Sequence, residues 1–479
     1  MATVGVELGE AVWTGNAPRH GAGEPLDVFD PSTGGLLATL PSAGADDVDA
    51  VVAAAAAALD GEWAGWSSLE RGRLCARIAA ALLADLDALT ELVVRDAGLP
   101  TSMARRDVET AARYFEYYAG LADKLHGDTI PLGPGFLDYT LREPWGVCAV
   151  VLPFNVPMQM AARSLAPALI TGNVVVLKPA EQAPFAPLAL ARRCAAAGAP
   201  AGVVNAVTGG AATGDRLVRH PLVDHVTFTG SLPTGRRIMA AAAEGMVPVL
   251  VELGGKSPQV VFADADLDTA AATIVGSALR TAGQACSAGT RILVQRDVVD
   301  DLLARVSAGV RALRLGPAST DPDVGPVIGA QQRERILAAV EQARGDGTQV
   351  LAGGGRGSGD GYFVEPTLLR AASEGSSAVR EEIFGPVLTA LPFADEADAV
   401  RLVNDSDYGL VAGIWTQDLG RAHRVARSVN AGQVFVNNYG VGGGVELPFG
   451  GYKRSGFGRL KGVAGALEYT QLKNVCVAL

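Results

Sequence analysis

Val147-Cys148-Ala149-Val150-Val151-Leu152 is the first of several short apolar runs that alternate with helical stretches. The later runs are 174–177, 203–207 and 225–228, and the helical stretches between them are 157–171, 185–197, 211–219 and 233–243. Short, continuously apolar runs are typical of strands buried on both faces, and their alternation with helices is typical of a doubly wound parallel sheet. The sequence therefore predicts an α/β fold.

A second α/β unit follows the first, and the change lies near 245–255. The alternation resumes with an apolar run at 260–262, a helix over 266–279, a second run at 292–295 and a helix over 298–312. On the amino-terminal side, Ala/Leu-rich segments predict helices over 46–60, 68–97 and 108–121. The fold class is thus a Rossmann-like doubly wound domain plus a second α/β domain.

Two further segments have a different pattern. Alternation in Leu137-Asp138-Tyr139-Thr140-Leu141-Arg142, after the turn-forming Leu132-Gly133-Pro134-Gly135, predicts a hairpin within 130–148. The chain ends in an apolar strand-like run, Asn474–Leu479. A solvated edge hairpin is one interpretation, but an unprotected apolar terminal strand usually finds a partner.

Composition excludes several classes of protein. The chain has 479 residues, of which 49% are apolar and 19% charged, so it is long enough for two or three folded domains. A formal net charge of −11 argues against a nucleic-acid partner. No apolar run approaches the roughly 20 residues of a membrane span, and the first ten residues carry no secretory signal pattern. Five scattered cysteines and five scattered histidines form neither a disulfide framework nor a metal site. We expect a cytoplasmic, metal-free protein that does not act at a membrane.

Cys286 is the first candidate for chemistry. It lies in the small-residue stretch Gly283-Gln284-Ala285-Cys286-Ser287-Ala288-Gly289, which leaves a thiol open to a substrate. Glu252 lies earlier, in Val251-Glu252-Leu253-Gly254-Gly255-Lys256. A thiol and a carboxylate, each in a glycine-rich bend, indicate covalent catalysis with a separate base. Taken alone, Cys286 is as easily a small buried hydrophobic residue.

Six motifs favour the catalytic interpretation, and they occur in the following order: Pro153-Phe154-Asn155, Lys178-Pro179-Ala180-Glu181, Phe228-Thr229-Gly230-Ser231, Glu252-Leu253-Gly254-Gly255-Lys256-Ser257-Pro258, Gly283-Gln284-Ala285-Cys286 and Glu382-Ile383-Phe384-Gly385-Pro386. Together they resemble the NAD(P)-dependent aldehyde dehydrogenase family, from about residue 25 to the C-terminus. The resemblance implies an NAD-binding domain over 1–125 and 146–248 and a catalytic domain over 249–433. It also implies an oligomerisation module over 126–145 and 465–479, in a homodimer or homotetramer.

The resemblance implies three catalytic residues. Cys286 attacks the aldehyde to give a thiohemiacetal and then a thioester, Glu252 activates water, and Asn155 donates to the developing oxyanion. The reaction is the NAD-dependent oxidation of an aldehyde to a carboxylic acid. The alternatives are a coenzyme A-acylating aldehyde dehydrogenase and a non-catalytic scaffold with the same fold.

The cofactor expected from the resemblance is NAD, with NADP possible. No GxGxxG follows the first strand, but Gly230-Ser231-Leu232-Pro233-Thr234-Gly235 offers free N–H groups at a helix start, which suit a phosphate. A plain strand–helix turn is the alternative. A carboxylate at Glu181 repels a 2′-phosphate and so favours NAD. The cofactor-binding residues implied are Phe154, Lys178, Glu181, Gly230, Ser231, Gly235, Leu253, Glu382 and Phe384.

Arg163 is the best indication of substrate. It lies eight residues after Asn155, about two helical turns on, so it can face the same pocket. Its guanidinium can bind a carboxylate or stack on a ring, or it can form a structural salt bridge. An aromatic or carboxylate-bearing aldehyde is therefore expected. The predicted pocket residues are Val156, Met160, Arg163, Ala285, Ser287, Tyr439 and Val441.

Three positions depart from the family pattern. Phe154 stands where many members carry Trp, which keeps an aromatic wall but loses its N–H. Leu460 stands where the family often has a Glu that is linked to proton relay, so we expect Glu252 to work without it. The run Tyr439-Gly440-Val441-Gly442-Gly443-Gly444 places four glycines in a loop that usually presents side chains to the substrate.

Overall fold

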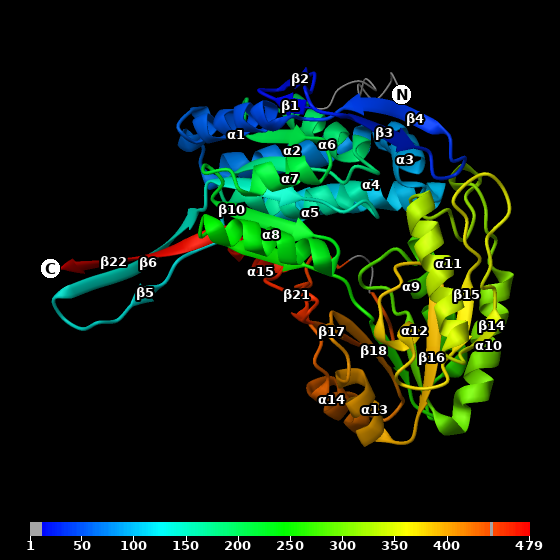
Figure 1. The fold of residues 1–479 in the computed structure, drawn as a ribbon. Helices are drawn as coiled ribbons and strands as arrows, with labels where there is room; N and C mark the ends of the chain where they lie inside the picture. The colour runs from blue at the N-terminus through cyan, green and yellow to red at the C-terminus, as the bar shows by residue number, and fades with distance from the viewer. Residues whose placement is uncertain (1–11, 441–443) are drawn as a thin grey trace.

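The computed structural model describes residues 12–440 and 444–479. This part of the chain forms two α/β units built on large sheets and a thin β arm that projects from them and ends at the C-terminus (Figure 1). The predicted α/β fold class is confirmed. None of the helices in the described ranges is both long and apolar enough to cross a membrane.

The first sheet has eight strands in the order β2-β1-β9-β8-β7-β10-β11-β21. Its parallel centre is buried throughout β7 to β10, as the continuous apolar runs predict. The central strands are β7 (Val147–Val151), β8 (Val174–Lys178), β9 (Val204–Val207), β10 (His225–Thr229) and β11 (Val249–Glu252). The antiparallel edge strands are β1 (Val12–Thr14), β2 (Ala17–Arg19) and β21 (Gly456–Phe457). β11 follows residue 248, the predicted end of the first unit, yet it pairs with β10.

Eight helices of the first unit pack either on the first sheet or on the helices that cover it (Figure 1). They are α1 (Ala45–Leu59), α2 (Ser68–Ala84), α3 (Leu86–Ala97), α4 (Thr101–Leu121), α5 (Pro157–Ile170), α6 (Phe185–Ala196), α7 (Ala211–Val218) and α8 (Leu232–Glu244). The single helix predicted over 68–97 was wrong, because Asp85 ends α2 and begins α3 with non-helical φ/ψ of −104° and 19°. The helix predicted from 108 begins at Thr101, directly after Pro100, which cannot continue a preceding helix.

The second sheet has seven strands in the order β14-β15-β16-β13-β12-β18-β19, parallel except for β14. The strands are β12 (Pro258–Val261), β13 (Arg291–Gln295), β14 (Gln349–Ala352), β15 (Thr367–Arg370), β16 (Val387–Phe393), β18 (Val411–Trp415) and β19 (Gln433–Val436). Its helices are α9 (Leu267–Leu279), α10 (Val299–Ala312), α11 (Ala330–Gly345), α12 (Ser377–Arg380), α13 (Glu396–Asn404) and α14 (Leu419–Ser428).

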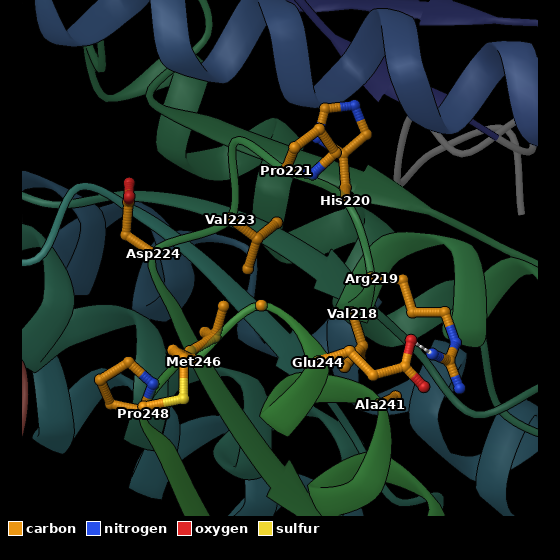
Figure 2. Close-up of a pocket in the computed structure, with 12 residues that line it drawn as sticks. Val218, Arg219, His220, Pro221, Val223, Asp224, Ala241, Glu244, Met246 and Pro248 are labelled. Atoms are coloured by element: carbon orange, nitrogen blue, oxygen red, sulfur yellow. Dashed lines mark hydrogen bonds and ion pairs between the residues drawn. The ribbon is translucent and has the colours of Figure 1, made fainter.

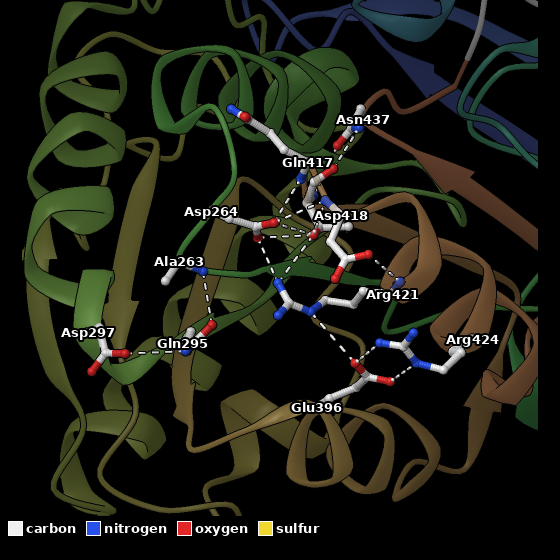
Figure 3. A network of polar contacts seen from close by, with 11 residues as sticks. Ala263, Asp264, Gln295, Asp297, Glu396, Gln417, Asp418, Arg421, Arg424 and Asn437 are labelled. Carbon is white, nitrogen blue, oxygen red and sulfur yellow. Dashed lines mark hydrogen bonds and ion pairs between the residues drawn. The ribbon is translucent and has the colours of Figure 1, made fainter.

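A polar network joins the ends of two neighbouring strands in this unit (Figure 3). The Asp264 carboxylate, just after β12, accepts hydrogen bonds from the Thr416 hydroxyl at 2.8 Å and from the amides of Gln417 and Asp418 at 3.1 Å. Arg421 Nη1 on α14 donates to the same carboxylate at 2.8 Å. The network fixes the start of α14 and explains these charges as structural.

The projecting arm is a three-stranded sheet in the order β22-β6-β5, formed by β5 (Thr129–Ile130), β6 (Phe136–Pro144) and β22 (Thr470–Ala478). β6 pairs with β22 along its whole length, whereas only Thr129 and Ile130 complete the predicted hairpin. The local alternation predicted the strand correctly but could not show that its main partner lies more than 300 residues away. Minor elements are β3 (Pro25–Phe29) with β4 (Leu36–Pro41), β17 (Tyr408–Gly409) with β20 (Tyr452–Lys453), and α15 (Gly462–Leu467).

Candidate active site

The predicted site residues meet where the two units adjoin. Lys178 ends β8 and Glu252 ends β11. Asn155 follows β7 and Gly230 follows β10, so the four residues share the carboxyl edge of the first sheet. This edge is where open α/β sheets bind ligands. Cys286 comes from the second unit, in the loop between α9 and β13.

The Cys286 loop is held from both units. The Asn155 Nδ2 group donates to the carbonyl of Gln284 at 2.8 Å, and the Gln284 side chain accepts from the Ile328 amide at 3.0 Å. A Cβ on Gly255 would lie 2.8 Å from the carbonyl oxygen of Cys286, so only glycine allows this approach. Thr281 and Ala282 have φ of 54° and 51°, a costly conformation that persists where the surroundings enforce it.

The Cys286 side chain faces an apolar wall. It packs against a cluster of Leu410, Val411 and Phe449, beside Phe435 and Tyr439. Burial raises the pKa of the Cys286 thiol to about 11, and the charge of Arg163 is the largest influence in the opposite direction. The thiol is therefore protonated at neutral pH unless a base or a bound ligand removes the proton.

Glu252 is a buried carboxylate whose nearest charged partner is Arg163. Its side chain is 1% exposed, and neither carboxylate oxygen has a hydrogen-bond partner among the described residues. Arg163 Nη2 lies 3.5 Å from Glu252 Oε2. Burial raises the pKa of Glu252 to about 8, and Arg163, followed by Arg459 and Lys461, opposes this shift. Glu252 thus titrates near neutral pH, in the range that suits a general base.

The predicted substrate residue Arg163 is buried among these groups. Its guanidinium carbon lies 4.4 Å from the centroid of the Phe449 ring, and Nη1 lies 3.7 Å from the Met160 sulfur. Its Nε and Nη2 donors have no hydrogen-bond partner in the described ranges. Arg163 therefore forms an ion pair, as one interpretation of the sequence allowed, but its partner is the candidate base itself.

Asn155 does not cap the helix that follows it. The first amides of α5, those of Met158 and Gln159, donate instead to the two Asp107 carboxylate oxygens at 3.0 Å. The capping role, which is the bland explanation for an asparagine at this position, is therefore taken by a residue of α4. Asn155 remains directed at the Cys286 loop.

The start of α8 offers an anion site at the same edge of the first sheet as Lys178. Ser231 precedes the helix and makes no side-chain cap hydrogen bond, so the first N–H groups of α8 keep their capacity for a ligand phosphate. A Cβ on Gly235 would lie 2.6 Å from Leu253 Cδ2, which packs the helix closely on the end of β11. Lys178 Nζ lies 3.6 Å from Glu181 Oε2. Two charged groups and a free helix start fit the ribose and phosphates of a dinucleotide.

Glu382 and Phe384 reach the same edge from the second unit. Glu382 Oε1 accepts a hydrogen bond from the Gly255 amide at 2.9 Å, and burial raises the pKa of its carboxyl to about 7. Phe384, with a φ of 55°, packs edge-on against Phe154 with 5.8 Å between ring centroids. The two aromatic residues predicted at the cofactor therefore contact each other across the boundary between the two units, which we call the seam.

The predicted pocket residues lie around this seam, apart from Val441, which is outside the described residues. The Tyr439 hydroxyl donates to the Ser287 carbonyl at 2.7 Å, Ala285 adjoins Cys286, and Val156 immediately precedes α5. Sequence reasoning missed Phe449 and Lys461. Lys461 Nζ lies 5.2 Å from the Phe449 ring centroid. The available signal was its position beside Leu460, a recognised departure from the family pattern.

A separate cavity of about 390 Å³ lies at the opposite edge of the first sheet (Figure 2). Its lining includes Val218, His220, Met246 and Pro248, which precede β10 and β11. The ion pair between Arg219 and Glu244 lies at its rim. None of the predicted site residues contributes to it, so this cavity is distinct from the seam that holds Cys286.

Comparisons with known proteins agree with this geometry. Residues 19–475 match the model of the aldehyde dehydrogenase family. A candidate aldehyde dehydrogenase from Burkholderia cenocepacia is 45% identical, with 98% of this chain and 99% of that chain covered and a TM-score of 0.96. An NAD⁺ complex of aldehyde dehydrogenase from Bacillus cereus is 36% identical, with 98% and 97% covered and a TM-score of 0.96. The aldehyde dehydrogenase KauB from Pseudomonas aeruginosa is 36% identical, with 99% and 98% covered and a TM-score of 0.96.

Proposed function

Because the chain belongs to the aldehyde dehydrogenase family, we propose that it oxidises an aldehyde to a carboxylic acid with NAD, through covalent catalysis by Cys286. One observation carries this proposal. Three residues from separate segments, Cys286, Glu252 and Asn155, are drawn to one seam by the Asn155–Gln284 hydrogen bond and the close approach of Gly255 to the Cys286 carbonyl.

Cys286 forms the first covalent bond. Its sulfur attacks the aldehyde carbon, and the carbonyl oxygen takes up negative charge in the resulting thiohemiacetal. Asn155 Nδ2 carries two hydrogens, of which the Gln284 carbonyl takes one, so the second can serve the developing oxyanion. The Cys286 backbone N–H is the second proposed donor. The thiol proton needs an acceptor at neutral pH, since burial raises the pKa of Cys286.

Glu252 acts as the base. Loss of hydride from the thiohemiacetal carbon leaves a thioester on Cys286, and water must attack this thioester to release the acid. Glu252 takes a proton from that water when its carboxyl is ionised. With a pKa of about 8, the carboxyl is mostly ionised above pH 8. Arg163 supports the step by favouring the ionised carboxylate.

The cofactor residues divide between the two units. Lys178 and Glu181 would hold the adenine ribose, the start of α8 from Gly230 to Gly235 the phosphates, and Glu382 and Phe384 the nicotinamide ribose. NAD, when bound, accepts the hydride that the substrate carbon loses. The Glu181 carboxylate disfavours a 2′-phosphate, so NAD is the proposed cofactor and NADP a possible second one. We assign the adenine ribose and phosphates to the first unit, and the nicotinamide ribose and the nucleophile to the second.

The proposed substrate is an aromatic or carboxylate-bearing aldehyde. Phe449, Phe435 and Tyr439 provide aromatic surface next to Cys286, and Arg163 provides a cation that can stack on a ring or bind a carboxylate. Transfer of the acyl group to coenzyme A is the less favoured alternative, because the buried carboxylate of Glu252 is suited to activating water. A non-catalytic scaffold would have no physical need for all three catalytic residues.

We also propose that the arm mediates assembly into a homodimer or homotetramer. β22 is an edge strand, so its outer hydrogen-bonding groups can pair with a neighbouring chain. The arm and its connecting loop also expose large apolar side chains: Ile130, Leu132, Phe136, Leu137, Leu141, Leu472 and Val477. Exposed apolar surface of this extent is typical of a protein interface.

The test uses purified protein, NAD or NADP, and a panel of benzaldehyde, vanillin, succinic semialdehyde, hexanal and acetaldehyde. NADH formation is followed by absorbance and the acid product by chromatography, without coenzyme A. We expect turnover with NAD, and we expect Cys286→Ala to abolish it while NAD binding, measured by calorimetry, is retained. Turnover in Cys286→Ala would exclude the nucleophile assignment. No reduction of either cofactor with any aldehyde would favour the scaffold.

A further inference from the structure

Two cationic side chains share one aromatic ring beside Cys286. The Arg163 guanidinium carbon lies 4.4 Å from the Phe449 ring centroid, and the Lys461 Nζ lies 5.2 Å from the same centroid. Phe449 is buried and packs beside Cys286. A cation over an aromatic face is stabilised by the ring, so both charges can be kept next to the thiol despite the loss of water.

The backbone places Lys461 beside the Phe449 ring. Phe449 and Leu460 form an isolated β-bridge with two reciprocal amide–carbonyl hydrogen bonds of 2.7 Å. The Leu460 side chain is fully buried in the core of the first unit. Lys461 follows with φ of 67° and ψ of 164°, a strained conformation for a residue other than glycine. Such strain persists where the surrounding structure enforces it, and it clusters at functional sites.

Among the described residues, two cations lie over the Phe449 ring, and Lys461 Nζ also donates to the Gly444 carbonyl at 3.4 Å. Glu252 is the carboxylate that contacts Arg163, and Arg163 Nε and Nη2 still have no hydrogen-bond partner in the described part of the chain. Glu446 also influences Lys461, but its carboxylate is half-exposed and pairs with Arg113 at 2.6 Å. Buried donors without acceptors are costly, and they mark a place where a ligand can supply the missing acceptor.

We propose that Arg163 and Lys461 together form an anion-binding subsite, and that Lys461 is a specificity-determining residue that favours aldehydes carrying a carboxylate group. The substrate carboxylate contacts the two cations while its aldehyde carbon lies at Cys286. This inference rests on the proposed function, because it names the class of aldehyde that the same site selects.

The titration of Lys461 gives the subsite a pH signature. Burial, together with the charge of Arg163, lowers the pKa of Lys461 to about 8 against the opposing influence of Cys286, Glu252 and Glu446. The amine is therefore charged below about pH 8 and loses its charge as the pH rises above that value. A bound carboxylate favours the charged form, so affinity for an anionic aldehyde is lost as the pH rises through this range.

The first test measures the local charge at Cys286 without turnover. Iodoacetate and iodoacetamide have nearly the same size but differ by one negative charge, and each alkylates a thiol. The rate at Cys286 is followed by peptide mass spectrometry, and N-acetylcysteine in the same solution gives the reference ratio. We expect Lys461→Met to lower the iodoacetate-to-iodoacetamide ratio at Cys286 by about tenfold, which corresponds to about 1.4 kcal/mol.

Three variants complete this test. Lys124→Met removes the same charge from an exposed lysine that pairs with Asp123, and it is expected to leave the ratio unchanged. Lys461→Arg is expected to keep the wild-type ratio. Lys461→Gln is measured beside Lys461→Met, so the conclusion does not depend on one variant folding. An unchanged ratio in Lys461→Met and Lys461→Gln, or a loss in Lys461→Arg equal to theirs, would overturn the proposal.

The second test compares matched aldehydes. 4-Carboxybenzaldehyde and methyl 4-formylbenzoate share one ring, and succinic semialdehyde and its methyl ester share one chain. We expect Lys461→Met to lower kcat/KM for the anionic member by about tenfold more than for its ester, mainly through KM, below pH 8. Equal losses for both members would refute the specificity role. Absence of turnover with every aldehyde would instead count against the proposed function, and the alkylation result would stand independently.

Discussion

Replacing Arg163 by methionine is expected to raise the apparent pKa of the base Glu252. The two side chains are buried, and Arg163 Nη2 lies 3.5 Å from Glu252 Oε2. An opposite charge at this range shifts a carboxyl pKa by about 1–3 units. Removal of the guanidinium therefore moves the pKa of Glu252 upward from about 8. The ionised carboxylate is the active form, so activity falls as the pH is lowered through the pKa of Glu252. In the variant this fall begins at a higher pH than in the wild type.

The expected loss follows from the fraction of ionised Glu252. At pH 8 about half of the carboxyl groups are ionised in the wild type, and a shift of one unit leaves about a tenth, so hydrolysis slows about fivefold. A shift of two units slows it about fiftyfold. Raising the pH by the size of the shift restores the rate, because the missing quantity is the ionised base and not the nucleophile.

The assay isolates hydrolysis of the acyl-enzyme. p-Nitrophenyl acetate acylates the thiol in a burst, and the later steady release of nitrophenolate follows deacylation, so no cofactor is needed. Rates are recorded between about pH 6.5 and 10 for the wild type, Arg163→Met and Arg163→Lys, the last of which keeps a charge. If Arg163→Met changes only KM for aldehydes while its deacylation profile coincides with that of the wild type, Arg163 does not hold Glu252 and the reasoning fails.

Three further outcomes test other parts of the site. Glu181→Gln is expected to lower the preference for NAD over NADP by about tenfold, because it removes the carboxylate that repels a 2′-phosphate; equal KM ratios for the two cofactors would contradict this role. Gly255→Ala places a Cβ 2.8 Å from the Cys286 carbonyl and is expected to reduce kcat by at least about tenfold by displacing the nucleophile loop, whereas Gly65→Ala, at a position with open space around it, leaves kcat unchanged. Leu472→Asp, on the exposed face of β22, is expected to reduce the oligomeric mass measured by light scattering, and an unchanged mass would exclude the arm as the interface.

The sequence predicted the central strands of the first sheet and most of the helices between them, but none of the edge strands β1, β2 and β21 and not β11. The buried runs near β7, β8, β9 and β10 were placed to within one or two residues, because a short, continuously apolar run between helical stretches is typical of a strand buried on both faces. The break at Asp85 was missed, since an aspartate inside an Ala/Leu-rich segment gives no strong signal of a helix end. The residue pattern did not indicate the pairing of β6 with β22, because alternation identifies a strand but contains no information about a distant partner; only the family resemblance placed both segments in one module.

The candidate site shows the same division between local and distant information. Arg163 lies on α5 and contacts Glu252, whereas Asn155 precedes that helix, so the helical spacing accounts for the position of only one of the two residues. The partner of Arg163 could not be predicted, since Glu252 ends a different strand and the pair exists only after the sheet has formed. The family resemblance itself is confirmed by the match over residues 19–475, while the roles of individual residues remain our proposals.

Leu460 and Lys461 show how a departure from a pattern can be misjudged from sequence. Leucine in place of a carboxylate suggested only a loss, and the structure places that leucine in the core while the next residue brings a cation to the Phe449 ring. A site with a glutamate at position 460 would carry an additional negative charge. Here that carboxylate is absent, and the Lys461 amine adds a positive charge instead. Arg163 contacts Glu252 and also has donors without a partner among the described residues. An anionic substrate that binds these donors therefore competes with Glu252 for the guanidinium that favours the ionised base. Lys461 offsets this competition, since its charge acts on both Glu252 and Cys286 and can neutralise a substrate carboxylate beside them. Selection of the substrate and strength of the base are thus coupled through one buried arginine.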